Sequence, residues 1–311
     1  MNIIARRKIF YIFSGTLFLA SIILFLLWGL KFGIDFTGGA LLEVEFPSSR
    51  PPISELQNRI QPLGVGSAQF SPSGDRGLLM RLRDVDEPTH QNLLNALAGV
   101  KDKTERDAVV REKQFSTIGP VIGKELAQRS IWALCTVLLL IVLYIAWAFR
   151  KISKPVSSWK FGVIAVVALL HDVFLPTGVF VVLGKLWGVE VDTLFVTAIL
   201  TILGFSVHDT IVVFDRIREN LKKSSFAAVR TKEGFEQVVN ESLNQTIVRS
   251  VNTSFVVLLT LAAIFLFGGE SVRYFSLALM LGVVFGTYSS IFIASPLLVT
   301  WHNYSLRKTI S

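Results

Sequence analysis

The sequence predicts an α-helical polytopic membrane protein with six transmembrane helices and an α+β, ferredoxin-like external domain between helices 1 and 2. The first reason is composition: 51% of the 311 residues are apolar and 17% are charged, whereas about a quarter are charged in a typical soluble protein. The second is six apolar runs long enough to cross roughly 30 Å of bilayer hydrocarbon. The third is a stretch after the first run whose mixed pattern suits a small soluble domain.

Each apolar run reaches or exceeds the roughly 20 residues that a spanning helix needs. The runs are Ile9–Leu30, Ser130–Phe149, Phe161–Gly184, Thr193–Phe214, Ile247–Gly268 and Tyr274–Trp301. The first follows three cations, as in a signal peptide, but it exceeds the roughly 7–15 residues of a signal core and no small-residue cleavage pattern follows. We therefore expect it to remain as an anchor. The single cysteine, Cys135, excludes an internal disulfide framework and a cysteine-based zinc site.

The basic net charge of +8 would suggest nucleic-acid binding in a soluble domain, but here the cations gather in alternate loops. The positive-inside rule then places these loops, and both termini, in the cytoplasm. The cations concerned are Arg6, Arg7, Lys8, Arg150, Lys151, Lys154, Lys160, Arg216, Arg218, Lys222, Lys223, Arg230, Lys232, Arg307 and Lys308. The short opposite loops hold only Lys185 and Arg273. The charge pattern therefore indicates membrane orientation, and we expect no nucleic-acid partner.

Residues 31–129 form the predicted external domain, and their charges cancel. Alternation and turn residues predict an order of strand, helix, strand, strand, helix and strand, which is the ferredoxin-like arrangement. The expected elements are Ala40–Phe46, Ile53–Ile60, Val65–Phe70, Gly77–Arg83, Thr89–Leu97 and Ala108–Thr117. The chain thus divides into residues 1–30 (cytoplasmic N-terminus and first helix), 31–129 (external domain), 130–301 (five-helix region) and 302–311 (cytoplasmic tail).

Nucleotide hydrolysis is not indicated by the sequence. The nearest approach to a phosphate-binding loop runs from Gly119 to Glu125, but it has three residues between its glycines and a glutamate where Ser or Thr should meet magnesium. Two His-Asp pairs, His171-Asp172 and His208-Asp209, lack the further ligands that a metal site would need. We therefore expect no enzymatic activity, no metal and no cofactor apart from a coupling ion.

Three ionisable residues lie inside the apolar runs: Asp172, Asp209 and Arg249. Charges at the bilayer centre cost about 2.5–3.5 kcal/mol on insertion scales and are functional candidates for that reason. Asp209 lies near the end of its helix and Arg249 near the start of the next, so both fall within about 10 Å of the same boundary. We expect these two side chains to meet, either as a proton relay or as a structural pair. Asp172 lies nearer the middle.

Arg249 belongs to a polar stripe on its predicted helix. Gln245, Arg249, Asn252 and Thr253 share one face, with Thr246 and Ser250 beside them. Such a stripe does not suit lipid, so we expect it to face other helices or a water-filled path. The sixth run carries Ala278, Gly282, Gly286 and Ser290 at four-residue spacing, which allows close helix packing. Pro176 and Pro296 are candidate kinks.

Several motifs resemble those of SecF, the smaller half of the SecDF protein-export complex in the resistance-nodulation-division superfamily. They are Phe32-Gly-Ile-Asp-Phe-Thr-Gly-Gly39, Gly119-Pro-Val-Ile-Gly-Lys-Glu-Leu126, the run from Ser206 to Asn220, and Gln245-Thr-Ile-Val-Arg-Ser250. The resemblance covers nearly the whole chain and implies that Asp209 and Arg249 are the relay acid and arginine. His208 stands where the family motif has asparagine, and we favour a packing role over a place in the relay for it.

The same resemblance implies roles for other residues. His171 and Asp172 fit the family as further relay candidates. The polar pathway predicted from helical spacing, without the resemblance, consists of Gln245, Thr246, Asn252 and Thr253. Asp35, Gly38 and Gly39 are expected to shape the junction between the first helix and the external domain, together with the motif glycines Gly119 and Gly123.

The resemblance also implies a function: coupling of the proton-motive force, or of sodium, to late steps of protein export in a bacterial-type inner membrane. The implied partners are a SecD-like subunit, the SecYEG translocon, YajC and unfolded preprotein. Two alternatives remain open. A half-transporter for a lipid or small molecule predicts a roomy apolar cavity in the external domain, and a non-transporting scaffold predicts a purely structural Asp–Arg pair.

Overall fold

The computed structural model describes residues 2–65, 68–83, 85–99, 106, 109–148, 157–225, 229 and 231–310. The chain divides into two compact units. A helical unit comprises Met1–Lys31 and Trp132–Ser311, and a smaller unit, here called the insert, comprises Phe32–Ile131. Among the cations used above to predict orientation, Arg150, Lys151, Lys154 and Arg230 lie outside the described residues.

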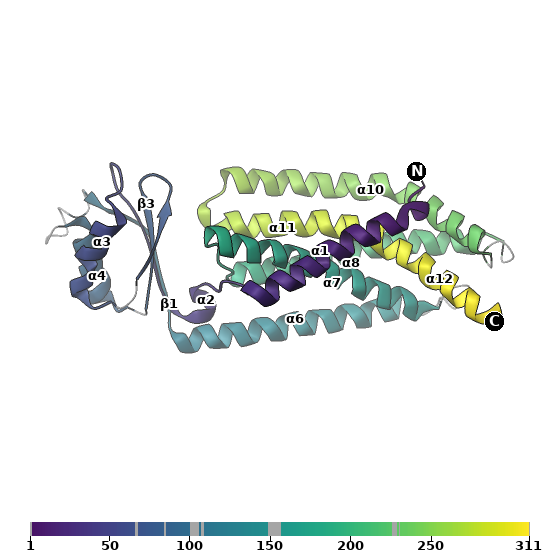
Figure 1. Ribbon diagram of the computed structural model, residues 1–311, viewed down its shortest axis with the longest axis horizontal. Helices are drawn as coiled ribbons and strands as arrows, with labels where there is room; N and C mark the ends of the chain where they lie inside the picture. Colours follow the sequence, from purple (N-terminus) through teal and green to yellow (C-terminus); the bar gives the residue numbers. More distant parts are fainter. Residues whose placement is uncertain are drawn as a thin grey trace. The chain divides into compact units, whose positions relative to one another are not determined.

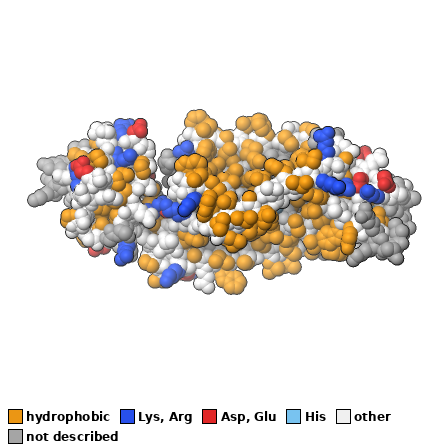
Figure 2. All heavy atoms as spheres, viewed as in Figure 1, with side chains coloured by type: hydrophobic (Ala, Val, Ile, Leu, Met, Phe, Trp, Pro, Cys, Tyr) orange, Lys and Arg blue, Asp and Glu red, His pale blue; other side chains and the backbone are white. Residues whose placement is uncertain are grey.

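Six helices are long and apolar enough to cross a membrane, which confirms the predicted number. They are α1 (Arg7–Trp28), α6 (Pro120–Ala148), α7 (Ser158–Trp187), α8 (Thr193–Lys223), α10 (Lys232–Phe267) and a last span made of α11 (Glu270–Ser289), η3 (Ser290–Ala294) and α12 (Ser295–Ile310) (Figure 1). Hydrophobic side chains cover most of the helical surface visible in Figure 2, as a lipid-facing surface requires. The chain is a multi-pass membrane protein.

Several helices extend well past their apolar runs. The run at Ile247–Gly268, for example, belongs to a helix that already begins at Lys232. Its first turns are amphipathic and bury Phe235, Val239 and Leu243 in the core of the helical unit. Hydropathy locates only the part of a helix that faces lipid, so it misses an extension that packs against protein.

The last span is not one regular helix as the sequence suggested. Residues Ser290–Ala294 form a π-helical turn, η3, between α11 and α12. Pro296, the second residue of α12, has no backbone N–H to donate, so the preceding turn loses one ordinary helical hydrogen bond. Single π-helical turns are rare and occur often at functional sites.

The small residues of α11 pack against α8, which confirms their predicted packing role. A Cβ added to Gly282 would lie 2.0 Å from the Ile202 Cγ1 atom, and one added to Gly286 would lie 3.1 Å from the Ser206 Cβ atom. Only glycine lets the two backbones approach this closely. Helices α7, α8 and α11 therefore form a tightly packed centre.

The insert contains a four-stranded antiparallel sheet with the strand order β2-β3-β1-β4. Its elements are the short α2 (Ile34–Thr37), β1 (Gly39–Glu45), α3 (Ile53–Ile60), η2 (Gln61–Leu63), β2 (Gln69–Ser73), β3 (Gly77–Leu82), α4 (Glu87–Ala98) and β4 (Arg111–Ile118). The order of strands with α3 and α4 is the ferredoxin-like order expected from the sequence. Figure 1 shows α3 and α4 on one side of the sheet.

Two predicted strand boundaries were wrong. The strand expected at Val65–Phe70 includes residues outside the described part, and β2 begins at Gln69 and extends to Ser73 despite Pro72. An edge strand tolerates proline because one row of its backbone groups has no neighbouring strand. The strand expected from Ala108, which is itself not described, begins at Arg111.

The core of the insert lies between the sheet and the two helices. Leu42, Val44 and Met80 from the sheet meet Leu56 and Leu93 from the helices, and all five side chains are fully buried. The helix α4 begins at a cap in which Asp86 accepts a hydrogen bond from the Thr89 backbone N–H. Hydrogen bonds from the Thr89 side chain and backbone hold the pKa of Asp86 below its usual value.

Candidate functional site

Asp172, in the middle of α7, is fully buried in the helical unit. Its Oδ2 atom accepts hydrogen bonds from the hydroxyl of Ser206 on α8 at 2.5 Å and from the hydroxyl of Ser289 on α11 at 2.6 Å. Its Oδ1 atom lies 2.8 Å from Nδ1 of the neighbouring His171, which is also buried. Three helices thus supply polar partners to one fully buried carboxyl group.

Asp209, on α8, is 8% exposed and occupies a second site of the same kind. The hydroxyl of Ser250 on α10 lies 2.8 Å from its Oδ1 atom, and the hydroxyl of Ser290 in η3 lies 3.1 Å from its Oδ2 atom. Hydroxyls suit such a site because they can donate to an ionised carboxylate or accept from a protonated one.

The two carboxyl sites share their supporting elements. Ser206, which contacts Asp172, precedes Asp209 by three residues on α8, so the two side chains lie on neighbouring positions of one helix face. Ser289 and Ser290 are adjacent in the chain and contact Asp172 and Asp209 respectively. A shift of the α11–η3 junction would therefore change the hydrogen bonding of both acids.

The structure does not contain the predicted direct pair of Asp209 and Arg249. Arg249 is exposed on α10, and no acidic side chain among the described residues lies within 4.0 Å of its guanidinium group. The reason is rotation about the helix axis. Ser250 faces Asp209, and the preceding residue points about 100° away. The prediction used depth along the helix alone, and depth does not determine the direction of a side chain.

The predicted polar stripe is present but faces outward. Gln245, Arg249, Asn252 and Thr253 are all exposed on α10, whereas Thr246, Ser250 and Ser254 form the buried face of the same helix. The Thr246 hydroxyl bonds to the backbone carbonyl of Ser242 at 3.0 Å and contacts neither carboxyl group. The structure therefore divides the expected pathway between an inner and an outer face.

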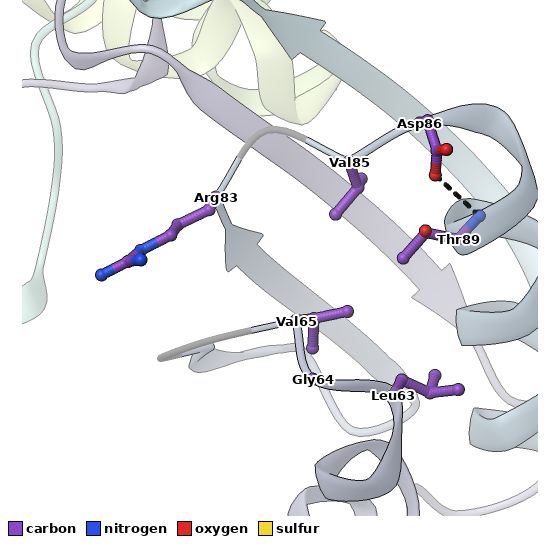
Figure 3. A pocket seen from close by; sticks show the side chains of 7 residues that line it. All are labelled: Leu63, Gly64, Val65, Arg83, Val85, Asp86 and Thr89. Carbon is purple, nitrogen blue, oxygen red and sulfur yellow. Dashed lines mark hydrogen bonds between the residues drawn. The ribbon is translucent and has the colours of Figure 1, made fainter.

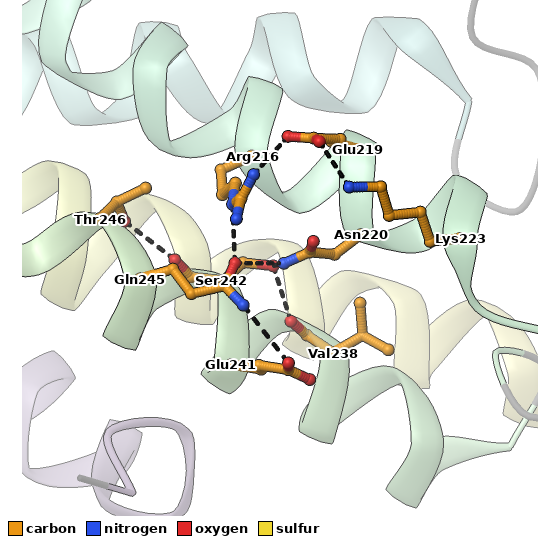
Figure 4. A network of polar contacts seen from close by, with 9 residues as sticks. All are labelled: Arg216, Glu219, Asn220, Lys223, Val238, Glu241, Ser242, Gln245 and Thr246. Carbon is orange, nitrogen blue, oxygen red and sulfur yellow. Dashed lines mark hydrogen bonds and ion pairs between the residues drawn. The ribbon is translucent and has the colours of Figure 1, made fainter.

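Gln245 belongs to a separate polar cluster that joins α8 to α10 (Figure 4). Its Oε1 atom accepts hydrogen bonds from Arg216 Nε at 2.6 Å and from Asn220 Nδ2 at 2.9 Å. Asn220 also donates to the Ser242 hydroxyl at 2.9 Å, and Glu219 pairs with both Arg216 and Lys223. These contacts fasten together the charged ends of the two helices that carry Asp209 and Ser250.

His208 is exposed, so the packing role favoured from the sequence is wrong within this chain. It lies on an outer face of α8 with Thr197, Thr201 and Gly204, which recur at helical spacing and are also exposed. Thr197 and Thr201 bond to the backbone of their own helix. This face is less apolar than the outer surface of α1, where Ile12 and Leu26 are exposed.

Sequence reasoning missed the hydroxyl groups that surround the acids. Ser206, Ser289 and Ser290 are fully buried, and a further short hydrogen bond joins Ser254 to Thr287. Two signals were available: Ser206 lies three residues before Asp209, and Ser289-Ser290 interrupts an apolar run. Serines alone are poor indicators because they also occur at close helix contacts.

The motif residues of the insert lie where the chain enters β1 and begins α6. Gly38 and Gly39 have φ values of 74° and 126°, which favour glycine. A Cβ on Gly38 would lie 2.7 Å from the Pro120 Cα atom, and one on Gly123 would lie 2.8 Å from the Gly38 nitrogen. Asp35 is half-buried in the first turn of α2. Gly119 has open space around it, so close packing does not require glycine there.

The insert also has a hollow of about 540 Å³ between η2 and the start of α4 (Figure 3). Its lining includes Leu63, Val65 and Val85 but also Arg83, Asp86 and Thr89. In Figure 3 the Arg83 side chain extends away from the other lining residues. This mixed lining differs from the roomy apolar cavity that a lipid or small-molecule exporter predicts, so the exporter alternative is not favoured.

Two models of known protein families match this chain. The family model "Protein export membrane protein SecD/SecF, C-terminal" matches residues 100–304, and the "SecD/SecF GG Motif" model matches residues 29–46. The second match includes the Gly38-Gly39 pair, and the first includes both buried acids and all the serines that contact them.

Individual proteins similar to this chain carry names from the same family. The protein translocase subunit SecF of Thermobaculum terrenum is 44% identical over 315 residues, covering 97% of this chain and 94% of the relative. The protein translocase subunit SecDF of Bacillus subtilis is 33% identical, covering 98% of this chain but 38% of the relative. The crystal structure of the translocon-associated membrane protein SecDF from Thermus thermophilus matches with a TM-score of 0.80 and 31% identity, covering 97% of this chain and 39% of that one. The chain therefore belongs to the SecD/SecF family of protein-export membrane proteins.

Proposed function

We propose that this chain is the SecF-type subunit of a protein translocase and that it couples proton movement to late steps of protein export. The observation that carries the proposal is the pair of carboxyl groups, Asp172 and Asp209, which accept hydrogen bonds from four serine hydroxyls on three membrane spans. Burying an acid at membrane depth is costly, so its presence favours a role in ion movement.

The geometry supports proton exchange at Asp209 in particular. This acid is 8% exposed, whereas Asp172 is sealed at 0%. Both oxygen atoms of Asp209 have a hydroxyl neighbour, which can stabilise the ionised form by donating and the protonated form by accepting. Asp209 is therefore the group that receives and releases the transported proton, and sodium is the alternative ion that the same ligands suit.

A SecD-like partner would complete the site. The exposed cation Arg249 lies next in sequence to Ser250, the hydroxyl neighbour of Asp209, and the outer faces of α8 and α10 carry polar side chains that lipid does not suit. Transporters of related architecture place the coupling site between two repeats. The SecDF relatives are more than twice as long as the part that this chain matches, so those proteins have room for a second repeat of the same kind.

The remaining parts of the proposal follow the predicted orientation. Both termini face the cytoplasm of a bacterial-type inner membrane, and the insert lies outside, where it meets unfolded preprotein emerging from SecYEG. YajC is a further expected partner. The driving force is the ion gradient, so the subunit hydrolyses no nucleotide and needs no cofactor.

The test is export of a preprotein into membrane vesicles that contain this chain with its SecD-like partner and SecYEG. Asp209→Asn should lower the rate of the export that depends on the proton gradient at least tenfold, which corresponds to about 1.4 kcal/mol in activation free energy. Asp215→Asn is a matched control because Asp215 lies on the same helix, is 64% exposed and pairs only with Arg218 among the described residues. Full proton-dependent export by the Asp209→Asn protein would refute the proposal.

A further inference from the structure

We propose that Ser289 and Ser290 are positioning residues that link the protonation of Asp172 and Asp209 to the backbone of the last membrane span. The inference rests on the proposed function, since it concerns the same carboxyl groups. It adds a route by which an arriving proton changes the conformation of a helix.

Each of the two serines has two hydrogen-bond acceptors within reach. The Ser289 hydroxyl lies 2.6 Å from Asp172 Oδ2 and 3.1 Å from the Gly286 carbonyl oxygen. The Ser290 hydroxyl lies 3.1 Å from Asp209 Oδ2 and 3.0 Å from the Thr287 carbonyl oxygen. A hydroxyl carries one proton and can fully satisfy only one acceptor at a time.

The protonation state of each acid decides which acceptor receives that proton. An ionised carboxylate is the stronger acceptor, so the serine donates to it. When a proton arrives on Oδ2, the acid becomes a donor and the serine oxygen accepts. The serine hydroxyl then rotates and donates to the carbonyl of its own helix. The one covalent change is the proton transfer itself: an O–H bond of the arriving hydronium ion breaks, and an O–H bond forms at the acid.

The two carbonyls lie where the helix geometry already changes. The Gly286 carbonyl accepts the backbone N–H of Ser290 at the end of α11, so the Ser289 hydroxyl would be its second donor. Serine hydroxyls that bond back to their own helix often bend it. The π-helical turn η3 begins at Ser290, whose own carbonyl accepts the Ser295 hydroxyl at 3.0 Å. Rotation of the serine hydroxyls would therefore alter the bend between α11 and α12.

The other hydroxyl neighbours of the acids do not share this double arrangement. Within the described residues, Ser206 is bonded through its hydroxyl only to Asp172, and Ser250 only to Asp209. They can hold the acids in place in either protonation state, because no helix carbonyl competes for their protons. Ser289 and Ser290 differ from these serines because, in each of them, a carboxyl group and a helix carbonyl compete for the same hydroxyl proton.

The ionisable groups around the site do not occupy the Oδ2 atoms that Ser289 and Ser290 contact. On α7, His171 lies against Asp172 Oδ1, the oxygen that the serines do not use. On α11, the Tyr288 hydroxyl accepts from Ser14 of α1. His208 on α8 and Arg249 on α10 are exposed. His171 acts electrostatically on Asp172 and His208 on Asp209, but among the described residues no charged side chain is hydrogen-bonded to the Oδ2 atoms that the two serines contact.

Infrared difference spectra between low and high pH test the inference on the full chain with its SecD-like partner in lipid. The carboxyl C=O bands are assigned by their loss in Asp172→Asn and Asp209→Asn. Ser289→Ala should shift the Asp172 band and Ser290→Ala the Asp209 band, because each loses one hydrogen-bond partner, and Ser→Thr should restore the band. Ser276→Ala is the matched control: Ser276 is fully buried on α11, and within the described part of the chain its hydroxyl bonds only to the Arg273 carbonyl, at 2.8 Å.

The inference is overturned if both serine variants leave the carboxyl bands in place, or if Ser276→Ala moves them equally. Assembly with the partner and thermal melting of each variant show that the fold is retained. The measurement does not depend on export. Shifted bands together with proton-independent export would reject the proposed function and keep the role of the two serines. Unshifted bands together with proton-dependent export would reject the role of the serines alone.

Discussion

The helical unit and the insert both bury apolar side chains, but the helical unit also buries two acidic ones. The insert packs Leu42, Met80 and Leu93 inside, as water-soluble domains do. The helical unit encloses Asp172 and Asp209 with serines, while side chains such as Leu26 and Phe267 are among its most exposed. The contrast shows that burial has a different meaning in the two parts. In the insert it marks the folding core, and in the helical unit a buried polar group marks the candidate function.

The largest effect that would test this comparison is an apolar replacement inside the helical unit. Asp172→Leu should destabilise it by about 4 kcal/mol, because His171 Nδ1 and the Ser206 hydroxyl lose their hydrogen-bond partner and an unsatisfied buried polar group costs about 1–3 kcal/mol. Asp172→Asn should cost much less, since it keeps an acceptor oxygen. Thermal melting in lipid nanodiscs measures both. If leucine proves as stable as asparagine, the polar interior is not a structural requirement.

A second test removes apolar volume from the insert. Met80 is fully buried in the sheet, and Met80→Ala should destabilise the insert by about 3 kcal/mol through lost packing and a cavity. Hydrogen exchange of the full chain should show faster exchange in β1 and β3 and unchanged rates in α7 and α8. Leu41→Ala, on the half-buried face of β1, is the control expected to have the smaller effect. Equal acceleration in the helical unit would contradict the division into two units.

The smallest effect concerns a charge at the surface of the insert. The pKa of Asp86 is lowered by its hydrogen bonds to Thr89, so the ionised cap stabilises α4 above the usual aspartate pKa of about 3.9. This contribution is lost as the pH falls through the lower, folded pKa. The protection factors of the α4 amides, which compare the measured exchange rate with the intrinsic rate at each pH, should therefore fall in acid, and fall less in Asp86→Asn, which retains a cap without the charge. An identical acid response in both proteins would exclude Asp86 as its source.

The sequence contained enough information for the architecture. Hydropathy located six spans, and period-two and helical patterns located α3 at its observed bounds, Ile53–Ile60. These predictions succeed because the apolar pattern of a segment reflects whether lipid, water or protein surrounds it. The predicted helix ends were wrong where a helix packs against protein beyond its lipid-facing part, as in the long N-terminal extension of α10.

The same reasoning predicted the ionisable residues of the candidate site but not their contacts. Charge and depth singled out Asp172, Asp209 and Arg249, but which side chains meet depends on rotation about each helix axis and on the neighbours across the bundle. A rotation of one position separates Ser250, which contacts Asp209, from the exposed Arg249. The serine pair could not be identified in advance because its role depends on the α11–η3 geometry.

The π-helical turn at Ser290–Ala294 makes the placement of α12 sensitive to an insertion or deletion of a single residue. Removing one residue there would restore an ordinary α-helix and turn everything after it by about 100°. His302, whose ring lies 3.9 Å from that of Phe235, would then leave its partner, and the buried Leu298 would face a different neighbour. The length of this short segment is thus constrained more tightly than its composition.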